Sequence, residues 1–537
     1  MYWVFILFLK KNNREMVEKR KEGMGGNKEG GDNQKKMFVG VVWNCAAEIK
    51  ILLTALFFLC LTITLLQYFL PSRFSLSPSD LRLCVSSVTK LSNSEPPSLV
   101  LSPPPLKSPS PPPPPSLQQD ETLGNGVIKR AFNPFGSAAY NFIQMGSYRG
   151  GLNSFAIIGL SSKPLHVYGK PHYQCEWVPL SNNQSDETVS TTITTTGYKI
   201  LPDWGYGRVY TVVVVNCTFK DNPIIPIGGS LILYASTGAG GGFGDDGGGY
   251  TDRIESLIEK HDSFNVSVFD SPPKYDYLYC GSSLYGNLSP QRVREWIAYH
   301  VKLFGEKSHF VIHDAGGIHE DVLQVLLPWI EKGYVTLQDI REQERFDGYY
   351  HNQFLVVNDC LHRYRFMSKW MFFFDVDEFI YVPPKNTIGS VLESLRDYSQ
   401  FTIEQMPMVN KLCLTDDLGK APRKWGFEKL VYRDVKRGIR RDRKYAIQPR
   451  NVFATGVHMS QNVGGRTLHK TERRIKYFHY HGTIAERREP CRNYINSTEL
   501  NFEGAPYVLD MTMRKAAASV KKFELKTIGD GLQRTRQ

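Results

Sequence analysis

The chain has 537 residues, of which 41% are hydrophobic and 22% are charged. This composition is that of a globular protein and excludes a chain that is disordered throughout, while the length exceeds what one hydrophobic core usually organises. We therefore expect two or three folded units joined by connectors. The formal net charge of +12 fits nucleic acid, anionic lipid or an acidic polymer as a partner, and charge alone does not choose among them.

An uncharged apolar run extends from Ile51 to Leu70, which matches the about 20 residues that a helix needs to cross a bilayer. A buried core helix is the alternative, but Pro71 and a Ser/Pro-rich tract follow at once and leave no neighbouring core. Lys and Arg occur ten times between residues 10 and 50 and four times between 71 and 118. This asymmetry predicts a cytosolic tail at 1–50 and a transmembrane helix at 51–70.

The rest of the chain is expected in the Golgi lumen, as in a single-pass type II membrane protein. N-x-S/T acceptors for N-glycosylation occur only beyond the predicted helix, at Asn183, Asn216, Asn265, Asn287 and Asn496. This address disfavours nucleic acid as a partner. Six cysteines of the same part could pair as disulfides in an oxidising lumen: Cys175, Cys217, Cys280, Cys360, Cys413 and Cys491.

The lumenal part divides into stretches of different texture. Residues 71–125 are rich in Pro and Ser, favour extended polyproline II and read as a stem. Residues 126–236 hold short β-branched and aromatic runs between Gly, Pro and Asn, which predict a β-sandwich. Residues 237–250 are Gly-rich without the GK[ST] of a phosphate loop, which indicates a flexible linker.

Residues 251–537 alternate between strand and helix patterns. Strands are expected in YDYLYCG, HFVIHD, YVTLQDI and WMFFFDVDEFIYV. Helices are expected in SPQRVREWIAYHVKLFG, where Ser289 is the N-cap, in IHEDVLQVLLPWIEKG, and at about 350–368. This alternation predicts an α/β unit with a largely parallel sheet.

Asp375 and Asp377 follow the apolar run WMFFF. A DxD triplet alone carries little information, but at the carboxyl end of a buried strand it lies where open α/β sheets bind ligands. Residues two apart on an extended chain project to one side, so both carboxylates are expected to hold one Mg²⁺ or Mn²⁺ ion. The alternative, an acidic turn that caps the strand, would leave two carboxylates beside aromatic side chains without a counter-ion.

Histidines downstream are further candidates for the metal site. His479 and His481 share one face if KYFHYHG is a strand, and His458 stands alone in FATGVHMS. A hydrogen-bonded structural histidine is an equally good interpretation of each one. The basic run from Arg433 to Arg450 fits a donor diphosphate or an acidic polysaccharide, with a solvated face as the commoner explanation.

The segments EWIAYH, FVIHDAG, FFFDVDEFIYVP, FATGVH and YFHYHG occur in the order typical of glycosyltransferase family 92, which the chain resembles from about residue 270 to 520. Over residues 40 to 537 it resembles the plant galactan β-1,4-galactosyltransferases of that family. The resemblance implies a GT-A-type, Rossmann-like catalytic domain, UDP-galactose as donor and Mn²⁺ as cofactor, with Mg²⁺ as the alternative. It further implies inversion at the anomeric carbon and growth of β-1,4-galactan side chains on pectic rhamnogalacturonan I.

The resemblance also assigns roles by position. Asp375 and Asp377 correspond to the metal motif, Asp314 in FVIHDAG to a donor-side acid, and His458 or His479 to histidines near the C-terminus. The β-rich unit resembles a carbohydrate-binding module. Its aromatic residues with faces for a sugar ring are Trp177, Trp204, Tyr206 and Tyr210.

An inverting transfer needs a base for the acceptor hydroxyl. Glu404, in the strand-like FTIEQMPM, is the preferred candidate, with Asp416 and Asp417 as competitors, although a structural carboxylate is a common explanation of all three. Two other functions stay open: a lumenal lectin or scaffold without transferase activity, and a transferase for another UDP-sugar. Assembly into a homo-oligomer also stays open.

Overall fold

The computed structural model describes residues 117–537 apart from 137–139, 163–170, 181–191, 205–208, 221–227, 238–249, 347–348, 420–423, 436–442, 472, 486, 500 and 536–537. The predicted cytosolic tail, membrane helix and most of the stem and Gly-rich linker lie outside the described residues. Within the described part, no helix has both the length and the apolar character to cross a bilayer.

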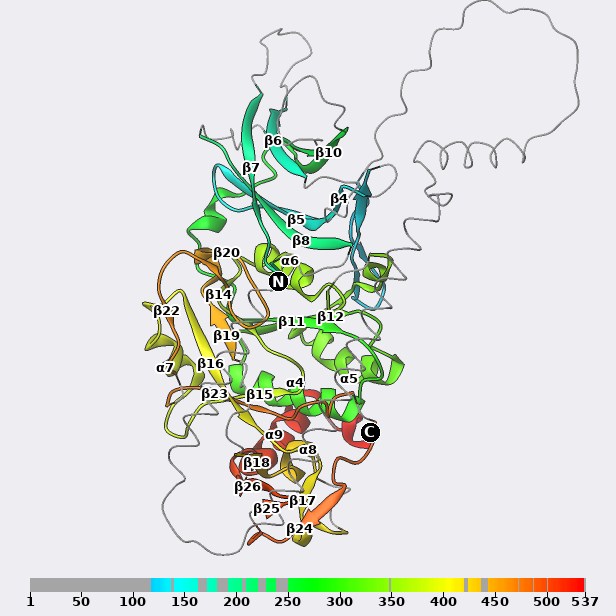
Figure 1. Ribbon diagram of the computed structural model, residues 1–537, viewed down its shortest axis with the longest axis vertical. Helices are drawn as coiled ribbons and strands as arrows, with labels where there is room; N and C mark the ends of the chain where they lie inside the picture. Colours follow the sequence, from blue (N-terminus) through cyan, green and yellow to red (C-terminus); the bar gives the residue numbers. More distant parts are fainter. Residues whose placement is uncertain are drawn as a thin grey trace, which may run out of the picture. The chain divides into compact units, whose positions relative to one another are not determined.

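An 11-stranded mixed sheet carries the C-terminal two thirds of the described chain (Figure 1). Its central strands lie in the order β13-β12-β11-β14 and run parallel. They are β11 (Tyr275–Leu284), β12 (Ser308–Asp314), β13 (Val335–Asp339) and β14 (Ser368–Phe373), connected by helices α4 (Pro290–Phe304), α5 (Glu320–Glu331) and α6 (Gln353–Arg363). The predicted alternation of strand and helix is confirmed here, and the third helix is shorter than the expected 350–368.

Both faces of this sheet are covered, as parallel strands require. Tyr279 of β11 packs in one core with Trp296 of α4, whereas its neighbours Leu278 and Cys280 pack in another core with Leu361 of α6. Successive side chains of a strand point to opposite faces, so β11 contributes to both cores. Ser289 accepts a hydrogen bond from the Arg292 amide and caps α4, as predicted.

The remaining strands of this sheet and the smaller elements complete the C-terminal part. On one side of β14 follow β19 (Lys444–Ile447), β16 (Gln400–Pro407), β23 (Lys476–His479) and β15 (Glu378–Tyr381), and β22 (Thr467–Leu468) pairs with β16. The other elements are β17 (Leu412–Leu414), β18 (Tyr432–Asp434), β20 (Val452–Ala454), β21 (Asn462–Val463), β24 (Asn493–Ile495), β25 (Asn501–Phe502), β26 (Ala505–Leu509), α7 (Ile388–Glu393), α8 (Gly426–Lys429) and α9 (Thr512–Ile528).

An antiparallel eight-stranded sheet precedes this part in the chain. Its order is β10-β9-β6-β7-β8-β5-β4-β3, and its strands are β3 (Asn133–Phe135), β4 (Phe142–Arg149), β5 (Ser154–Ser162), β6 (His172–Pro179), β7 (Ile193–Ile200), β8 (Tyr210–Thr218), β9 (Gly229–Thr237) and β10 (Tyr250–Glu259). The sheet curls back on itself and brings β4 close to β10. The Gln144 side chain of β4 donates to the Ser256 carbonyl of β10 at 2.8 Å. The two halves enclose an apolar core, as in the predicted sandwich.

Two domain boundaries differ from those expected from the sequence. Strand β10 belongs to the eight-stranded sheet, so the β-unit continues to Glu259 instead of ending at 236. Its buried positions include the polar residues Asp252 and Ser256, so the strand lacks the alternation of apolar and polar residues that predicts a strand. In addition, β1 (Glu121–Thr122) and β2 (Ile128–Lys129) lie at the edge of the mixed sheet, where β2 pairs with β13, although the sequence placed them in the stem and the β-unit.

Helix α6 lies between the two sheets (Figure 1). The Asp359 carboxylate of α6 forms a bidentate ion pair with Arg130, which follows β2, and accepts a hydrogen bond from Tyr148 of β4 at 2.5 Å. All six cysteines named in the sequence form disulfides, namely Cys175–Cys217, Cys280–Cys360 and Cys413–Cys491. The second one joins α6 to β11, so the helix is tied covalently to the sheet that carries the site.

Candidate active site

The two aspartates of the DxD motif lie in a turn between β14 and β15. The Glu378 amide donates to the Asp375 carbonyl at 3.1 Å, and the Glu378 carboxylate accepts from the Asp375 amide at 2.7 Å. The chain is therefore not one continuous strand from WMFFF to FIYV, as the sequence suggested. As a result, the side chains of Asp375 and Asp377 have different hydrogen-bond partners.

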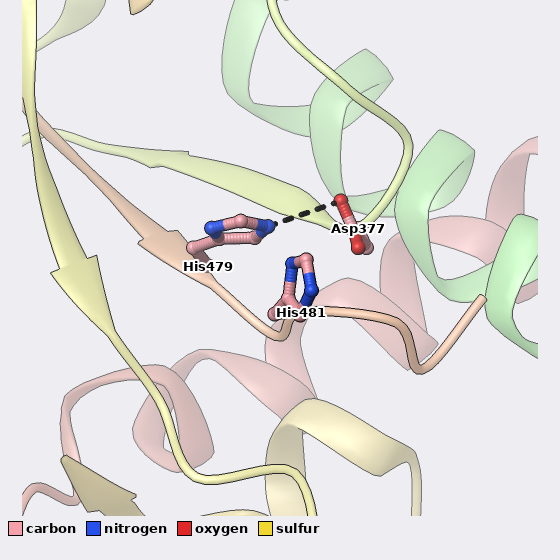
Figure 2. A group of neighbouring side chains, drawn as sticks. All are labelled: Asp377, His479 and His481. Carbon is pink, nitrogen blue, oxygen red and sulfur yellow. Dashed lines mark ion pairs between the residues drawn. The ribbon is translucent and has the colours of Figure 1, made fainter. Parts of the chain in front are cut away.

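Asp377 lies in a group of metal-ligand side chains with His479 and His481. One potential ligand atom of each lies within 4.8 Å of those of the others. His479 Nε2 lies 3.5 Å from Asp377 Oδ1, and both imidazoles reach toward the carboxylate from the end of β23 and the loop after it (Figure 2). The Gly482 amide donates to Asp377 Oδ2 at 3.0 Å and orients the carboxylate.

His479 lies between the Asp377 carboxylate and the side chain of Gln405. Burial lowers its pKa, but the hydrogen bond and charge of Asp377 outweigh burial, so the pKa of His479 lies above its ordinary value. The Gln405 amide contacts His479 Nδ1. The atom at this contact is Gln405 Nε2, which donates to Nδ1, while the other ring nitrogen faces Asp377.

Asp375 has a different environment. Its Oδ2 lies 2.7 Å from Lys444 Nζ of β19, and its Oδ1 accepts from Ser282 of β11 at 2.9 Å. Burial raises the pKa of Asp375, but the Lys444 ammonium outweighs burial and holds it below the ordinary value. Burial raises the pKa of the neighbouring Glu378 to about 7. Asp375 is therefore an ionised carboxylate with Lys444 as its counter-ion, and the charge of His479 also lowers its pKa.

The other sequence candidates for the metal lie elsewhere. His458 is exposed, its Nδ1 lies 3.1 Å from the Arg443 carbonyl oxygen, and it is not in the group around Asp377. The basic run that was expected to be a solvated face or a diphosphate site contains Lys444, whose side chain is only 3% exposed. The sequence predicted Asp377 and named both histidines of the group, and it missed Lys444 because its burial depends on strand pairing.

The three candidate bases have unequal positions. Gln405 contacts His479, so its neighbour Glu404 on β16 points to the opposite face and away from the histidines. Asp417 is buried and ion-paired with Lys424 and Arg514, which leaves no free basic oxygen in a substrate site. Asp416 is exposed in the 3₁₀ turn after β17 and keeps its candidacy.

Asp314 lies at the carboxyl end of β12, at the edge of the parallel strands. Burial raises the pKa of Asp314 above its ordinary value, and the amides of Gly316 and Ile318 partly offset that effect because both donate to its Oδ1. Asp314 Oδ1 therefore stabilises the loop that follows β12. The second lies 4.0 Å from Arg341 and faces the same edge of the sheet.

The candidate sugar-stacking residues of the β-unit divide in the same way. Trp177 is fully buried and stacked on Phe155, and Tyr210 is buried, so neither offers a free face and both predictions are wrong. Trp204 is 59% exposed, and Tyr206 lies outside the described residues. The glycosylation candidates Asn265, Asn287 and Asn496 are exposed, Asn216 is half-buried, and Asn183 lies outside the described residues.

Comparison with known proteins finds a matching family and several similar proteins. Residues 275–535 match glycosyltransferase family 92. Galactan beta-1,4-galactosyltransferase GALS3 of Arabidopsis thaliana is 60% identical over 517 residues, which are 95% of this chain and 99% of that protein. GALS2 of the same plant is 58% identical over 94% of this chain and 98% of its own length. Beta-1,4-galactosyltransferase galt-1 of Caenorhabditis elegans is 26% identical over 39% of this chain and 49% of its own.

Proposed function

The chain belongs to glycosyltransferase family 92, and from this premise we propose that it transfers galactose from UDP-galactose to the end of a β-1,4-galactan chain. The family and the names of the relatives that are 58% and 60% identical over nearly their full length support this function. The observation that carries it is the group of Asp377, His479 and His481 beside the ionised Asp375, next to the carboxyl ends of parallel strands. Such edges are where open α/β sheets bind nucleotides.

The residues present fit a divalent cation. Asp377, His479 and His481 would hold it, and one carboxylate with two imidazoles suits Mn²⁺ better than Mg²⁺, which prefers an all-oxygen shell. The bound ion would neutralise charge on the diphosphate of the donor. Lys444 keeps Asp375 ionised and in place, while Ser282 fixes its second oxygen.

The transfer inverts the anomeric carbon in one displacement. The acceptor hydroxyl oxygen forms a bond to C1 of galactose, the bond from C1 to the diphosphate oxygen breaks, and UDP leaves with the bonding electron pair. The hydroxyl proton passes to a base. Asp416 is the exposed candidate for that base, and its segment follows Asn410, whose side chain donates to the His481 carbonyl at 2.9 Å.

The address and the other finer features belong to the same proposal. Three disulfides and exposed N-glycosylation acceptors support a location in the oxidising Golgi lumen. An N-terminal membrane anchor and the galactan of pectic rhamnogalacturonan I as acceptor are further parts of the proposal. The parallel strands with helices on both faces support a GT-A-type catalytic domain. Trp204 on the β-unit supports carbohydrate binding there.

The test is a transfer assay on the purified lumenal part. Labelled β-1,4-galacto-oligosaccharide, UDP-galactose and Mn²⁺ should give longer oligosaccharides by mass spectrometry, whereas Asp377→Ala should give none. Asp416→Asn should lose transfer and still bind UDP if Asp416 is the base. Transfer of a sugar from a different UDP-sugar, and not from UDP-galactose, would show that the proposed donor is wrong. If the wild-type protein binds galactan but releases no UDP from UDP-galactose, the protein is a lectin and the proposed enzymatic function is wrong.

A further inference from the structure

Two consecutive serines of β11, Ser282 and Ser283, contact the turn that carries Asp375 and the loop before α6. The pairing of β11 with β12 shifts register between Cys280 and Ser283, as at a β-bulge. Ser282 donates to Asp375 at 2.9 Å, whereas Ser283 donates to the carbonyl of His351 at 2.8 Å. Bulges recur beside active sites because they re-aim side chains. Here the bulge lets one strand hold the carboxylate and the loop before α6.

That loop has an unusual backbone. Tyr350, His351 and Asn352 have φ values of 49°, 50° and 56°. The left-handed region disfavours residues with side chains, so this conformation persists only where the surroundings enforce it. Asn352 is fully buried and donates to the side chain of Gln343 at 2.7 Å, so it anchors the turn.

The turn presents the ring of His351 to Tyr285, the first residue after β11. The two ring centroids are 3.9 Å apart with an angle of 27° between the planes, which is a stacked arrangement. Tyr285 is nevertheless 45% exposed. The structure thus supports one aromatic ring from behind while leaving much of its surface open to solvent at the ligand-binding edge of the sheet.

The backbone around Tyr285 is held closely. The amides of Ala315 and Gly317 both donate to the carbonyl of Leu284, at 2.8 and 3.1 Å. A Cβ atom on Gly317 would lie 2.8 Å from the Tyr285 nitrogen, so only glycine lets the loop after β12 approach this far. The exposed ring is therefore presented from a backbone that the loop after β12 holds in place.

From these contacts we propose that Tyr285, backed by His351, is the stacking surface for the nucleobase of the sugar-nucleotide donor. The inference rests on the proposed function. Tyr285 follows Ser282, which binds Asp375, by three residues, at most about 10 Å along the strand direction. This length is comparable with the reach from a base through its ribose to the phosphates. Every base has a π-face, so an exposed and well-supported aromatic ring suits this part of the ligand.

The experiment compares two probes that share the phosphate site. Binding of UDP and of inorganic diphosphate is measured by titration calorimetry with Mn²⁺ present, for wild type and Tyr285→Ala. We expect Tyr285→Ala to weaken UDP binding by about 10-fold or more, in line with the loss of one stacked base, and to leave diphosphate binding unchanged. Tyr285→Phe keeps the ring and should bind UDP as wild type does. Tyr198→Ala removes a tyrosine that is 68% exposed on the other sheet and serves as the matched control.

His351→Gly is the second variant, for the case that Tyr285→Ala does not fold. Glycine accepts the left-handed φ of this position and removes only the supporting ring, so UDP binding should weaken while diphosphate binding stays. Equal binding of UDP to wild type and variant, equal weakening of both probes, or weakened galacto-oligosaccharide binding in place of UDP would overturn the inference alone. Wild type that binds neither probe would overturn the proposed function with it.

Discussion

At the scale of single residues, the two aspartates of the DxD motif have different neighbours. Asp377 has two imidazoles beside it, whereas Asp375 has the Lys444 ammonium. Lys444 also lies 3.7 Å from the buried Glu378, so one cation stabilises two carboxylates. Without it, burial would strongly disfavour a charge on Glu378, whose side chain is 1% exposed. We infer that Lys444 makes the acidic turn compatible with the folded state.

The histidine group leads to the first residue-scale prediction. His481→Ala and His479→Ala should raise the Mn²⁺ concentration needed for half-maximal transfer by about 10-fold or more, since each loses one of three ligands and outer-shell changes alone cost about 10- to 100-fold. Metal titrations of activity, together with calorimetric Mn²⁺ binding, measure the effect. His458→Ala, outside the group, should titrate like wild type. Equal titration of all three variants would contradict the assignment.

The same residues show what the sequence could and could not predict at this site. Asp377 and the two histidines were recognisable from DVD after an apolar run and from HYH, because both patterns place chemistry at strand ends. The difference between the neighbours of the two aspartates was not recognisable. It depends on the turn at Asp375 and on the pairing of β14 with β19, which brings Lys444 beside it from 69 residues away.

At the scale of elements, helix α6 packs against both the mixed sheet and the β-unit. One of its faces packs on β11 and the other on β4, β5 and β8 of the β-unit, and the Arg130–Asp359 ion pair is buried at that junction. Arg363 of the same helix lies 3.5 Å from Asp359 and adds a second cation. The β-unit is thus built into the catalytic part through a buried charged network, which an independent appended module would not need.

This junction predicts a strong coupling between Arg130 and Asp359. Asp359→Leu alone should lower the free energy of unfolding by about 3 kcal/mol, because it leaves the buried Arg130 with only the partly exposed Asp120 carboxylate as counter-ion. The double variant Arg130→Met/Asp359→Leu should be less destabilised than the sum of the single ones by more than about 1 kcal/mol. Urea denaturation of the four proteins closes the cycle. Additive effects would mean that solvent already screens the pair.

Element boundaries were the weaker part of the sequence-based prediction, for a physical reason. The runs of β11, β12 and β14 were found because both of their faces are buried and apolar. Strand β10 was missed because two of its inward positions are polar and hydrogen-bond to the β-unit. Strand β2 was assigned to the wrong unit because two residues paired at a sheet edge leave no periodic pattern.

At the scale of the whole molecule, the protein buries histidines that must stay neutral. Burial lowers the pKa of His300 and His362 to about 3 and that of His309 and His313 to about 4. Their ring nitrogens contact backbone carbonyl groups in both cores, for example His300 Nδ1 with the Trp296 carbonyl at 2.8 Å. A proton on any of these rings would place an uncompensated charge in the interior.

These pKa values predict a steep loss of stability in mild acid. The unfolded chain binds protons at its histidines near pH 6.5, whereas the folded protein does not until about pH 4. The stabilisation is therefore complete above pH 6.5 and falls as the pH drops below it. Four such groups give a loss of about 5 kcal/mol between pH 7 and pH 5.5, to be measured by urea denaturation at each pH.

His362→Gln separates this effect from other titrations, because a neutral amide can still donate to the Phe453 carbonyl that His362 contacts at 3.0 Å. The variant should lose part of its stability at every pH, but the slope of its unfolding free energy against pH should fall by about 1.4 kcal/mol per unit between pH 6 and pH 5, the contribution of one proton. Because the readout is the slope, a general packing defect does not imitate it. An unchanged slope would mean that water reaches the ring and lets it titrate in the folded protein.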